Sequence, residues 1–243
     1  MTTRTSWLPK RRPMASNVLY YPMINDAYST TIKDWSSGNN PGTMVGATWD
    51  RIAKGVQTSR YDGNDYVNID VAVNDLAATT KGTWMLWIKL DTAIPLSSAY
   101  IMTFGDTNAS ELIGLVIRAG AGKFEATLTD GGIRQWALAT DAQALSNGIW
   151  GHLALIQNGI APVLVVNGVQ VAQTFIDETD DTAWFSDCAG LDNGRIGCLN
   201  YNGAGNGFFI VNGNIDIVDI ENTNLAVSQV KGIYDVERHL FGV

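Results

Sequence analysis

The sequence has few of the residues that make catalytic or metal centres. Its 243 residues include only two cysteines, Cys188 and Cys198, and two histidines, His152 and His239. Neither cysteine has a neighbour suited to activating a thiolate, and no Cys/His spacing is typical of zinc. Two cysteines rule out a disulfide framework. We expect both cysteines to be unreactive free thiols. The alternative is one local disulfide across a hairpin, if the protein works outside the cell.

Long apolar runs are also missing. No stretch approaches the ~20 residues needed to span a membrane. The segment 1–14 has no apolar core of the kind found in secretory signals, so we expect a protein made in the cytoplasm and no membrane partner. Charged residues are 16% of the chain and hydrophobic residues 46%, which excludes bulk disorder.

The charge is distributed unevenly along the chain. The net charge is −8, but four basic residues precede the first acidic one, Asp26, and the remainder carries about −12. An acidic body is a poor nucleic-acid binder and suits cation sites.

The basic segment 1–16 contains Pro9 and Pro13 and shows no periodicity. It is typical either of an unstructured tail or of an arm that docks on an acidic neighbour, because Arg and Lys pair with carboxylates. We favour a docking arm followed by one domain, residues 17–243. The predicted docking residues are Arg4, Trp7, Lys10, Arg11 and Arg12.

Short strands punctuated by Gly, Asn and Asp follow from Val18 onward. Residues 123–129 alternate apolar and polar side chains, which predicts a half-buried strand, and residues 84–90 predict a central strand covered on both faces. Asn167-Gly168 and Asn212-Gly213 each predict a β-hairpin. One short helix is expected, with Val230, Ile233 and Tyr234 on one face and Ser228 as its cap.

Seven short motifs, in order over about residues 18–236, resemble those of the laminin-G-like, or concanavalin A-like, jelly-roll family. They are the loop from Asp34 to Gly42, Tyr61 to Val67, Thr83 to Lys89, Trp150 to Ala154, Val165 to Gly168, Gly213 to Val218 and Leu225 to Tyr234. The resemblance implies an all-β, two-sheet antiparallel sandwich with a short C-terminal helix. In this family Trp84, Trp87 and Trp150 belong to the core, and His152 is structural.

The same sandwich carries lectins, adhesins, structural modules and glycosidases. Glucanases sharing it place three carboxylates on one strand at period-2 spacing. Here Asp219 and Glu221 hold the second and third positions, but Ile217 holds the first. We therefore expect a protein that is not an enzyme.

Calcium is the cofactor that the resemblance implies, since related jelly rolls often carry one at a sandwich edge. Asp62, Asp65 and Asp216 are the candidate ligands, with solvated loop acids as the alternative. A second acidic stretch contains Asp177, Asp180, Asp181 and Asp187, and solvated loop acids are the favoured interpretation there.

Carbohydrate binding needs aromatic rings next to amides and carboxylates. One loop supplies Asn200, Tyr201, Asn202 and Asn206. Trp184 and Trp136, near turns, are further candidates. The alternative is that Asn and Gly simply form turns there.

These features favour a non-enzymatic surface protein of a bacteriophage virion, of the capsid-decoration or fibre type. The reasons are a lectin-like module without an export signal and a basic arm for other virion proteins. The sandwich would bind glycans or only reinforce the particle. The alternatives are a free, extracellular, calcium-dependent lectin or adhesin and, less favoured, a glycoside hydrolase. A homo-oligomer is left open.

Overall fold

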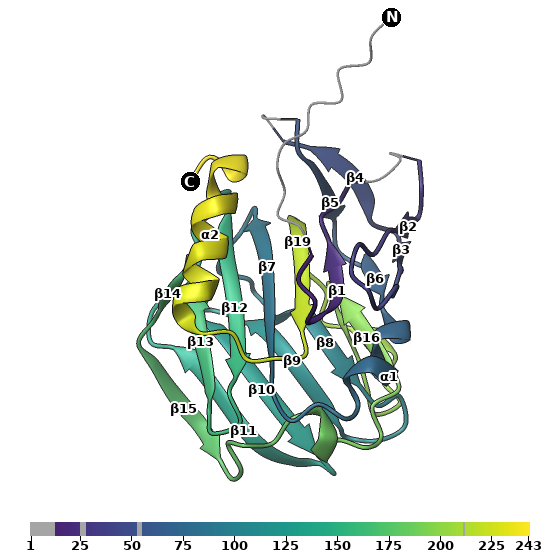
Figure 1. Cartoon of the computed structure of the whole chain (residues 1–243), viewed down its shortest axis with the longest axis vertical. Coiled ribbons are helices and arrows are strands. Elements are labelled where there is room, and N and C mark those ends of the chain that lie inside the picture. The colour runs from purple at the N-terminus through teal and green to yellow at the C-terminus, as the bar shows by residue number, and fades with distance from the viewer. Residues whose placement is uncertain (1–12, 25–27, 53–54, 211) are drawn as a thin grey trace, which may run out of the picture.

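Two antiparallel sheets stacked face to face make up the computed structural model, which describes residues 13–24, 28–52, 55–210 and 212–243. Figure 1 views them from the side of the C-terminal helix, with the second sheet behind the first. The predicted all-β sandwich is confirmed.

The first sheet has eight strands, in the order β14-β13-β12-β7-β19-β5-β4, with β1 also paired to β19. Its strands are β1 (Asn17–Tyr21), β4 (Thr48–Arg51), β5 (Gln57–Tyr61), β7 (Gly82–Leu90), β12 (Gly151–Gln157), β13 (Pro162–Val166), β14 (Val169–Gln170) and β19 (Gly213–Glu221).

The second sheet has nine strands, in the order β15-β11-β10-β9-β8-β16-β6-β3-β2. They are β2 (Thr31–Ile32), β3 (Gly42–Val45), β6 (Tyr66–Asn68), β8 (Ala99–Gly105), β9 (Leu112–Ile117), β10 (Phe124–Asp130), β11 (Ile133–Thr140), β15 (Gln173–Glu178) and β16 (Asn193–Ile196). A separate hairpin joins β17 (Leu199–Asn200) to β18 (Asn206–Gly207).

The helical elements are short except for the last. They are η1 (Asp70–Ala72), α1 (Val73–Leu76), η2 (Phe185–Asp187) and α2 (Val227–Phe241). In the described part of the chain, no helix is long and apolar enough to cross a membrane.

Aromatic side chains fill the space between the sheets. Trp84 of β7 lies 5.4 Å, centroid to centroid, from both Phe104 of β8 and Trp184, and Phe185 packs against all three rings. All four residues are buried. Large rings suit this position because each removes a large apolar area from water.

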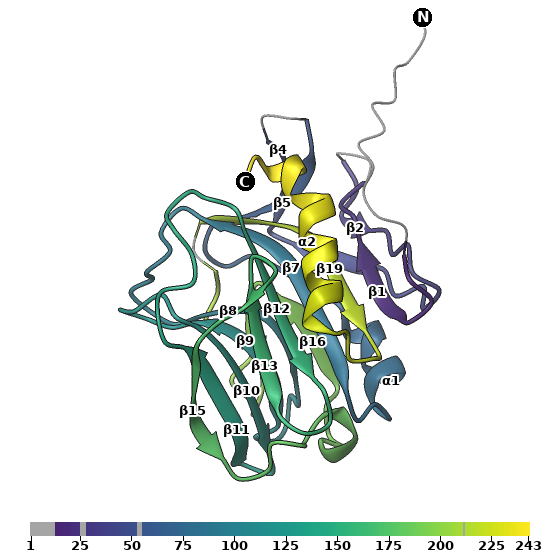
Figure 2. The same cartoon turned by 60° about the vertical axis from the view of Figure 1, so that its left-hand side comes forward.

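Helix α2 covers the outer face of the first sheet (Figures 1 and 2). Phe241 stacks on Trp87 with ring centroids 4.3 Å apart, and Val230 packs in a cluster with Met85 and Ala154. The described elements place no helix over the outer face of the second sheet. The two outer faces therefore differ in their cover.

Several local predictions are confirmed. Strand β7 lies between β12 and β19 with its apolar side chains buried, as expected. Val166 pairs with Val169 across Asn167-Gly168, whose φ angles of 51° and 74° suit a type I′ turn.

Two local predictions are wrong. The described residues before Asn212-Gly213 do not pair with β19: Phe208 accepts a bond from the amide of Tyr100, and Ile210 donates to Gly197. Strand β19 pairs instead with β1, β5 and β7. Helix α2 begins one residue before Ser228, and the side chain of Gln229 accepts a bond from the amide of Ala226 at 2.8 Å.

Candidate functional site

The outer face of the second sheet carries rows of side chains aligned by strand register. Tyr100, Val116 and Glu125 lie side by side on β8, β9 and β10. The next row consists of small residues, Thr103, Gly114, Thr127 and Ala137. All alternate with core side chains such as Phe124 and Leu128, so they point away from the core.

Glu125 is the unusual residue of this face, because its side chain is a carboxylate on a central strand and only 2% exposed. Its Oε2 lies 3.1 Å from Nε of Arg118 but accepts no hydrogen bond from any described residue. Burial raises the pKa of Glu125, while Arg118 and Arg134 lower it by less. The ion pair with Arg118 offsets part of the cost of burying this charge.

Two glycines allow the close packing beside Glu125. A Cβ on Gly114 would lie 3.2 Å from the ring of Tyr100, and a Cβ on Gly105 would lie 2.4 Å from the backbone oxygen of Asn200. The tyrosine ring therefore lies against β9, and the β17–β18 hairpin lies against the end of β8.

Three polar contacts hold the hairpin on the sheet. Asn193 Nδ2 donates to the backbone oxygens of Gly105 and Asn200, at 2.7 and 3.1 Å. Arg195 Nε donates to Oδ1 of Asn206 at 3.1 Å. These contacts fix where the half-exposed ring of Tyr201 lies.

Aromatic and charged groups meet beside this hairpin. Phe208 is 57% exposed, and its ring centroid lies 5.9 Å from that of Tyr100. Burial, then the nearby Tyr201 and Glu125, raises the pKa of Tyr100. Rings that stack on an apolar sugar face, next to a carboxylate and a guanidinium that bind hydroxyls, can hold a polyhydroxy ligand.

The predicted ligand residues divide into two groups. The structure brings Asn200, Tyr201, Asn202 and Asn206 together on the hairpin, which lies against the end of β8. The prediction for Trp184 is wrong: its ring is 0% exposed between Trp84 and Trp136, so no ligand can stack on it. Trp136 is equally buried.

Sequence reasoning missed Tyr100, Arg118, Glu125 and Phe208. A signal for one of them was present, because Glu125 occupies the polar side of a clearly alternating strand. That pattern predicted an exposed side chain, whereas neighbouring strands and side chains bury it.

The predicted calcium ligands do not form one group. Asp65 is buried in the turn after β5, where its Oδ2 accepts a bond from the amide of Asp62 at 2.8 Å. Asp216 is buried on β19, beside Trp87. Within the described ranges, no three Asp, Glu, His or Cys side chains are arranged to hold a metal ion. The three acids therefore do not lie together as one ligand set, and calcium binding stays a prediction.

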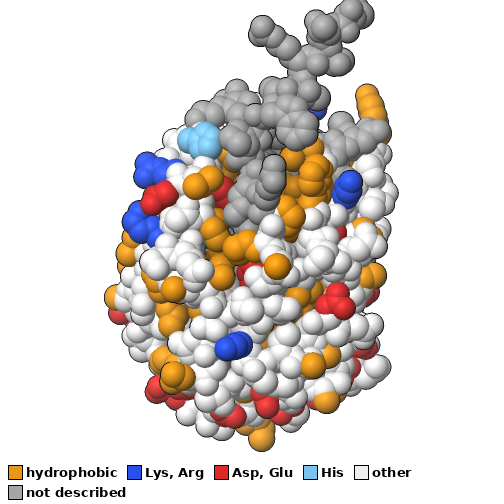
Figure 3. All heavy atoms as spheres, viewed as in Figure 1, with side chains coloured by type: hydrophobic (Ala, Val, Ile, Leu, Met, Phe, Trp, Pro, Cys, Tyr) orange, Lys and Arg blue, Asp and Glu red, His pale blue; other side chains and the backbone are white. Residues whose placement is uncertain are grey.

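The second acidic stretch has structural contacts. Asp180 accepts bonds from Thr182, and Asp187 accepts a bond from the amide of Trp184. Asp177 forms an ion pair with Arg134. Viewed from the α2 side, acidic side chains gather at the lower end of the molecule (Figure 3).

The carboxylates considered for glycoside hydrolysis are buried under β1. Asn17 Nδ2 donates to Asp219 Oδ1 at 2.5 Å and to Glu221 Oε1 at 2.6 Å. Both acids are at most 1% exposed, and they point away from the face that carries Glu125. They offer no accessible pair to a sugar.

The remaining predicted residues have simple outcomes. Cys188 and Cys198 are free and buried, and burial raises the pKa of both thiols, that of Cys198 to about 12. The docking residues Arg4, Trp7, Lys10, Arg11 and Arg12 lie outside the described residues.

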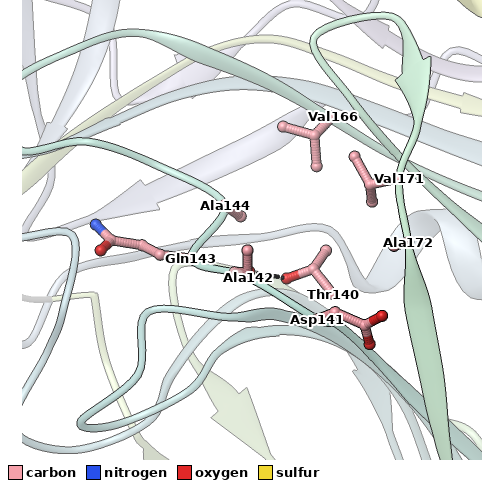
Figure 4. Close-up of a pocket in the computed structure, with 8 residues that line it drawn as sticks. All are labelled: Thr140, Asp141, Ala142, Gln143, Ala144, Val166, Val171 and Ala172. Carbon is pink, nitrogen blue, oxygen red and sulfur yellow. Dashed lines mark hydrogen bonds between the residues drawn. The ribbon is translucent and has the colours of Figure 1, made fainter.

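A small cavity of about 140 Å³ lies at another place, between the end of β11 and the β13–β14 turn (Figure 4). Ala144, Val166 and Val171 are among its lining side chains. It is smaller than the ~300–1,000 Å³ typical of ligand pockets.

Comparison with known proteins agrees with this architecture. A family model described as the concanavalin A-like lectin/glucanases superfamily matches residues 61–231. No curated protein matches the sequence.

Solved structures with the same fold include three sugar- or receptor-binding domains. Domain 4 of AbnA, an extracellular arabinanase from Geobacillus stearothermophilus in complex with arabinotriose, has a TM-score of 0.64 at 19% identity, over 90% of this chain and 98% of that one. The CBM40 of a Ruminococcus gnavus sialidase, bound to α2,3-sialyllactose, has a TM-score of 0.61 at 17% identity, over 73% of this chain and 96% of that one. The receptor-binding domain of a botulinum neurotoxin C/D mosaic has a TM-score of 0.63 at 15% identity, over 90% of this chain and 51% of that one. At these identities the likeness shows the fold.

Proposed function

Because this chain belongs to the concanavalin A-like lectin/glucanases superfamily, we propose that it is a non-catalytic domain that binds carbohydrate. The site is the outer face of the nine-stranded sheet, around Tyr100, Glu125 and the β17–β18 hairpin. The single observation that carries this proposal is the ring of Phe208, which is 57% exposed and lies 5.9 Å, centroid to centroid, from the ring of Tyr100 beside the β17–β18 hairpin.

The groups divide the work of binding. The guanidinium of Arg118, which is held by its ion pair with Glu125 and is 45% exposed, donates to a sugar oxygen. The rings of Tyr100, Tyr201 and Phe208 offer apolar surface to the carbon face of the sugar. The sugar-bound arabinanase domain and sialidase module support this proposal because they have the same fold.

A glycan array with matched variants tests the proposal. We expect wild-type protein to bind a restricted set of glycans, Tyr100→Ala to lose at least 10-fold in affinity, and Tyr28→Ala to bind like wild type. Tyr28 is 96% exposed on the segment before β2, away from the site. No binding by wild type, or equal binding by Tyr100→Ala, would contradict the proposal.

Calcium dependence is a separate part of the proposal. Repeating the array with EDTA tests it, and Asp62→Asn and Asp65→Asn test the two acids that share a turn. Glycan binding that persists in EDTA would show that calcium is not required, and it would leave the proposed glycan site standing.

The absence of catalysis is tested by turnover of β-glucans. We expect no hydrolysis, because Asp219 and Glu221 are buried against Asn17. Hydrolysis by wild type that is lost in Asp219→Asn or Glu221→Gln would instead support the glycoside hydrolase alternative.

The setting remains the hypothesis made from the sequence: a bacteriophage virion surface, with the basic segment 1–16 as a docking arm. The charge of that segment supports it, because its Arg and Lys side chains can pair with carboxylates of a neighbour. Deleting residues 1–16 is expected to prevent incorporation into particles. Truncated protein that still incorporates rules out the arm.

A further inference from the structure

We infer that the ligand of this face is a neutral glycan, and that the face disfavours sialylated or other anionic sugars. This inference rests on the carbohydrate-binding function proposed above. It concerns the charge of the ligand, which the fold alone does not determine.

Each of three arginines on this face is already paired with an acid. Arg118 Nε lies 3.1 Å from Oε2 of Glu125, and Arg134 Nη1 lies 2.7 Å from Oδ2 of Asp177. Arg195 Nη1 contacts Oδ1 of Asp70. The charges cancel pair by pair, so none of these arginines is a free cation for a sugar carboxylate.

The pairs also bring two acids, Glu125 and Asp177, to this face. Arg134 and Asp177 lie near enough to influence the charge of Glu125, and Arg118 contacts it directly. A sugar hydroxyl can accept a bond from Arg118, whose side chain is 45% exposed, without bringing a charge next to Glu125. A carboxylate has no proton to donate, and it would be repelled by Glu125 and Asp177.

The wider charge of the protein acts in the same direction. Lys123, one residue before β10, is a further cation at the margin of this face, but the whole chain carries a net charge of −8. A net negative protein repels anionic ligands at a distance, an effect that weakens with salt.

Titration calorimetry with arabinotriose, lactose and α2,3-sialyllactose tests the inference, alongside an array that contains neutral, sialylated and uronate glycans. We expect the glycans that bind to be neutral, and their anionic counterparts to bind at least 10-fold more weakly in 150 mM salt. Binding confined to anionic glycans would overturn the inference but not the proposed function. Silence toward every glycan would overturn both.

Variants that leave an arginine without its acid sharpen the test. Glu125→Gln and Asp177→Asn should each shift the ratio of neutral to anionic affinity toward the anionic glycan, by 5-fold or more. Asp177 is exposed, so its variant should fold even if Glu125→Gln does not. The control is Asp235→Asn, which breaks the Lys231–Asp235 pair on α2 and should leave the ratio unchanged. An unchanged ratio in both test variants would contradict the charge argument.

Discussion

Glu125 is a residue for which the sequence pattern and the folded structure give different environments. Its strand alternates as a half-buried strand should, and Phe124, Ala126 and Leu128 do enter the core. The polar side was expected to meet water, yet Glu125 and Thr127 are buried. Alternation predicts which way a side chain points, but not what neighbouring strands place beside it.

The pH dependence of stability tests the buried carboxylate. Burial raises its pKa above the usual value near 4.5, so the folded state binds the proton more tightly than the unfolded state. Wild type therefore loses stability relative to Glu125→Gln as the pH rises from 4 through the native pKa. Urea unfolding of both proteins between pH 4 and 7 measures this difference. A difference that does not change with pH would show that Glu125 is solvated like a surface acid.

Trp184 provides the opposite case of an aromatic residue predicted for a ligand and found in the core. Trp184→Ala should lower the free energy of unfolding by about 3–5 kcal/mol, because it removes a ring packed against Trp84, Phe185 and Trp136. Denaturant titration measures the loss. A stable Trp184→Ala protein with weakened glycan binding would restore the residue to the site.

At the scale of elements, the β17–β18 hairpin links the predicted loop to the sheet. Composition alone identified the loop as rich in Asn and Tyr, but not the surface it covers. The contacts that place it come from Asn193 and Arg195 of β16 and from Gly105 of β8, a strand that is distant from the hairpin in sequence. Such long-range pairing has no local sequence signal.

Removing the anchor of the hairpin should weaken binding without unfolding the protein. Asn206→Ala deletes the acceptor for Arg195 Nε. We expect a 3- to 10-fold loss of glycan affinity, faster hydrogen exchange at hairpin amides, and little change in Tm. Asn224→Ala, at an exposed site before α2, is the matched control. Unchanged glycan affinity in Asn206→Ala would show that the position of the hairpin does not contribute to binding.

Helix α2 offers a test of stability that leaves the site untouched. Gly232 lies inside the helix, and a Cβ there would meet nothing within 4 Å. Gly232→Ala should therefore stabilise the protein by roughly 0.5–1 kcal/mol, because glycine is a poor helix former. Thermal and urea unfolding measure this gain, and glycan affinity should not change. Destabilisation would mean that the helix is not formed as described.

The two wrong local predictions have different causes. Ser228 was a good cap by residue type, but Gln229 reaches the free amide of Ala226 and the helix begins earlier. Asn212-Gly213 has the turn signal of a hairpin, yet β19 finds stronger partners in β7 and β5, far away in the chain. At the helix one local contact replaces another, whereas at Asn212-Gly213 tertiary pairing overrides a local preference.

For the whole molecule, the order of the motifs was enough to predict the sandwich, because each motif marks a strand or turn of the same fold. It was not enough to predict the proposed binding face. That depends on α2 covering the first sheet, and on strand register bringing Tyr100 and Glu125 together from β8 and β10. Both are properties of the assembled chain.

The most direct test of the central claim is hydrogen–deuterium exchange of the free protein and of the protein saturated with its strongest array ligand. The account predicts slower exchange in β8, β9, β10 and the β17–β18 hairpin, with α2 and β12 unchanged. Protection confined to α2, to the turn of Asp62 and Asp65, or to the cavity near Thr140 would contradict it.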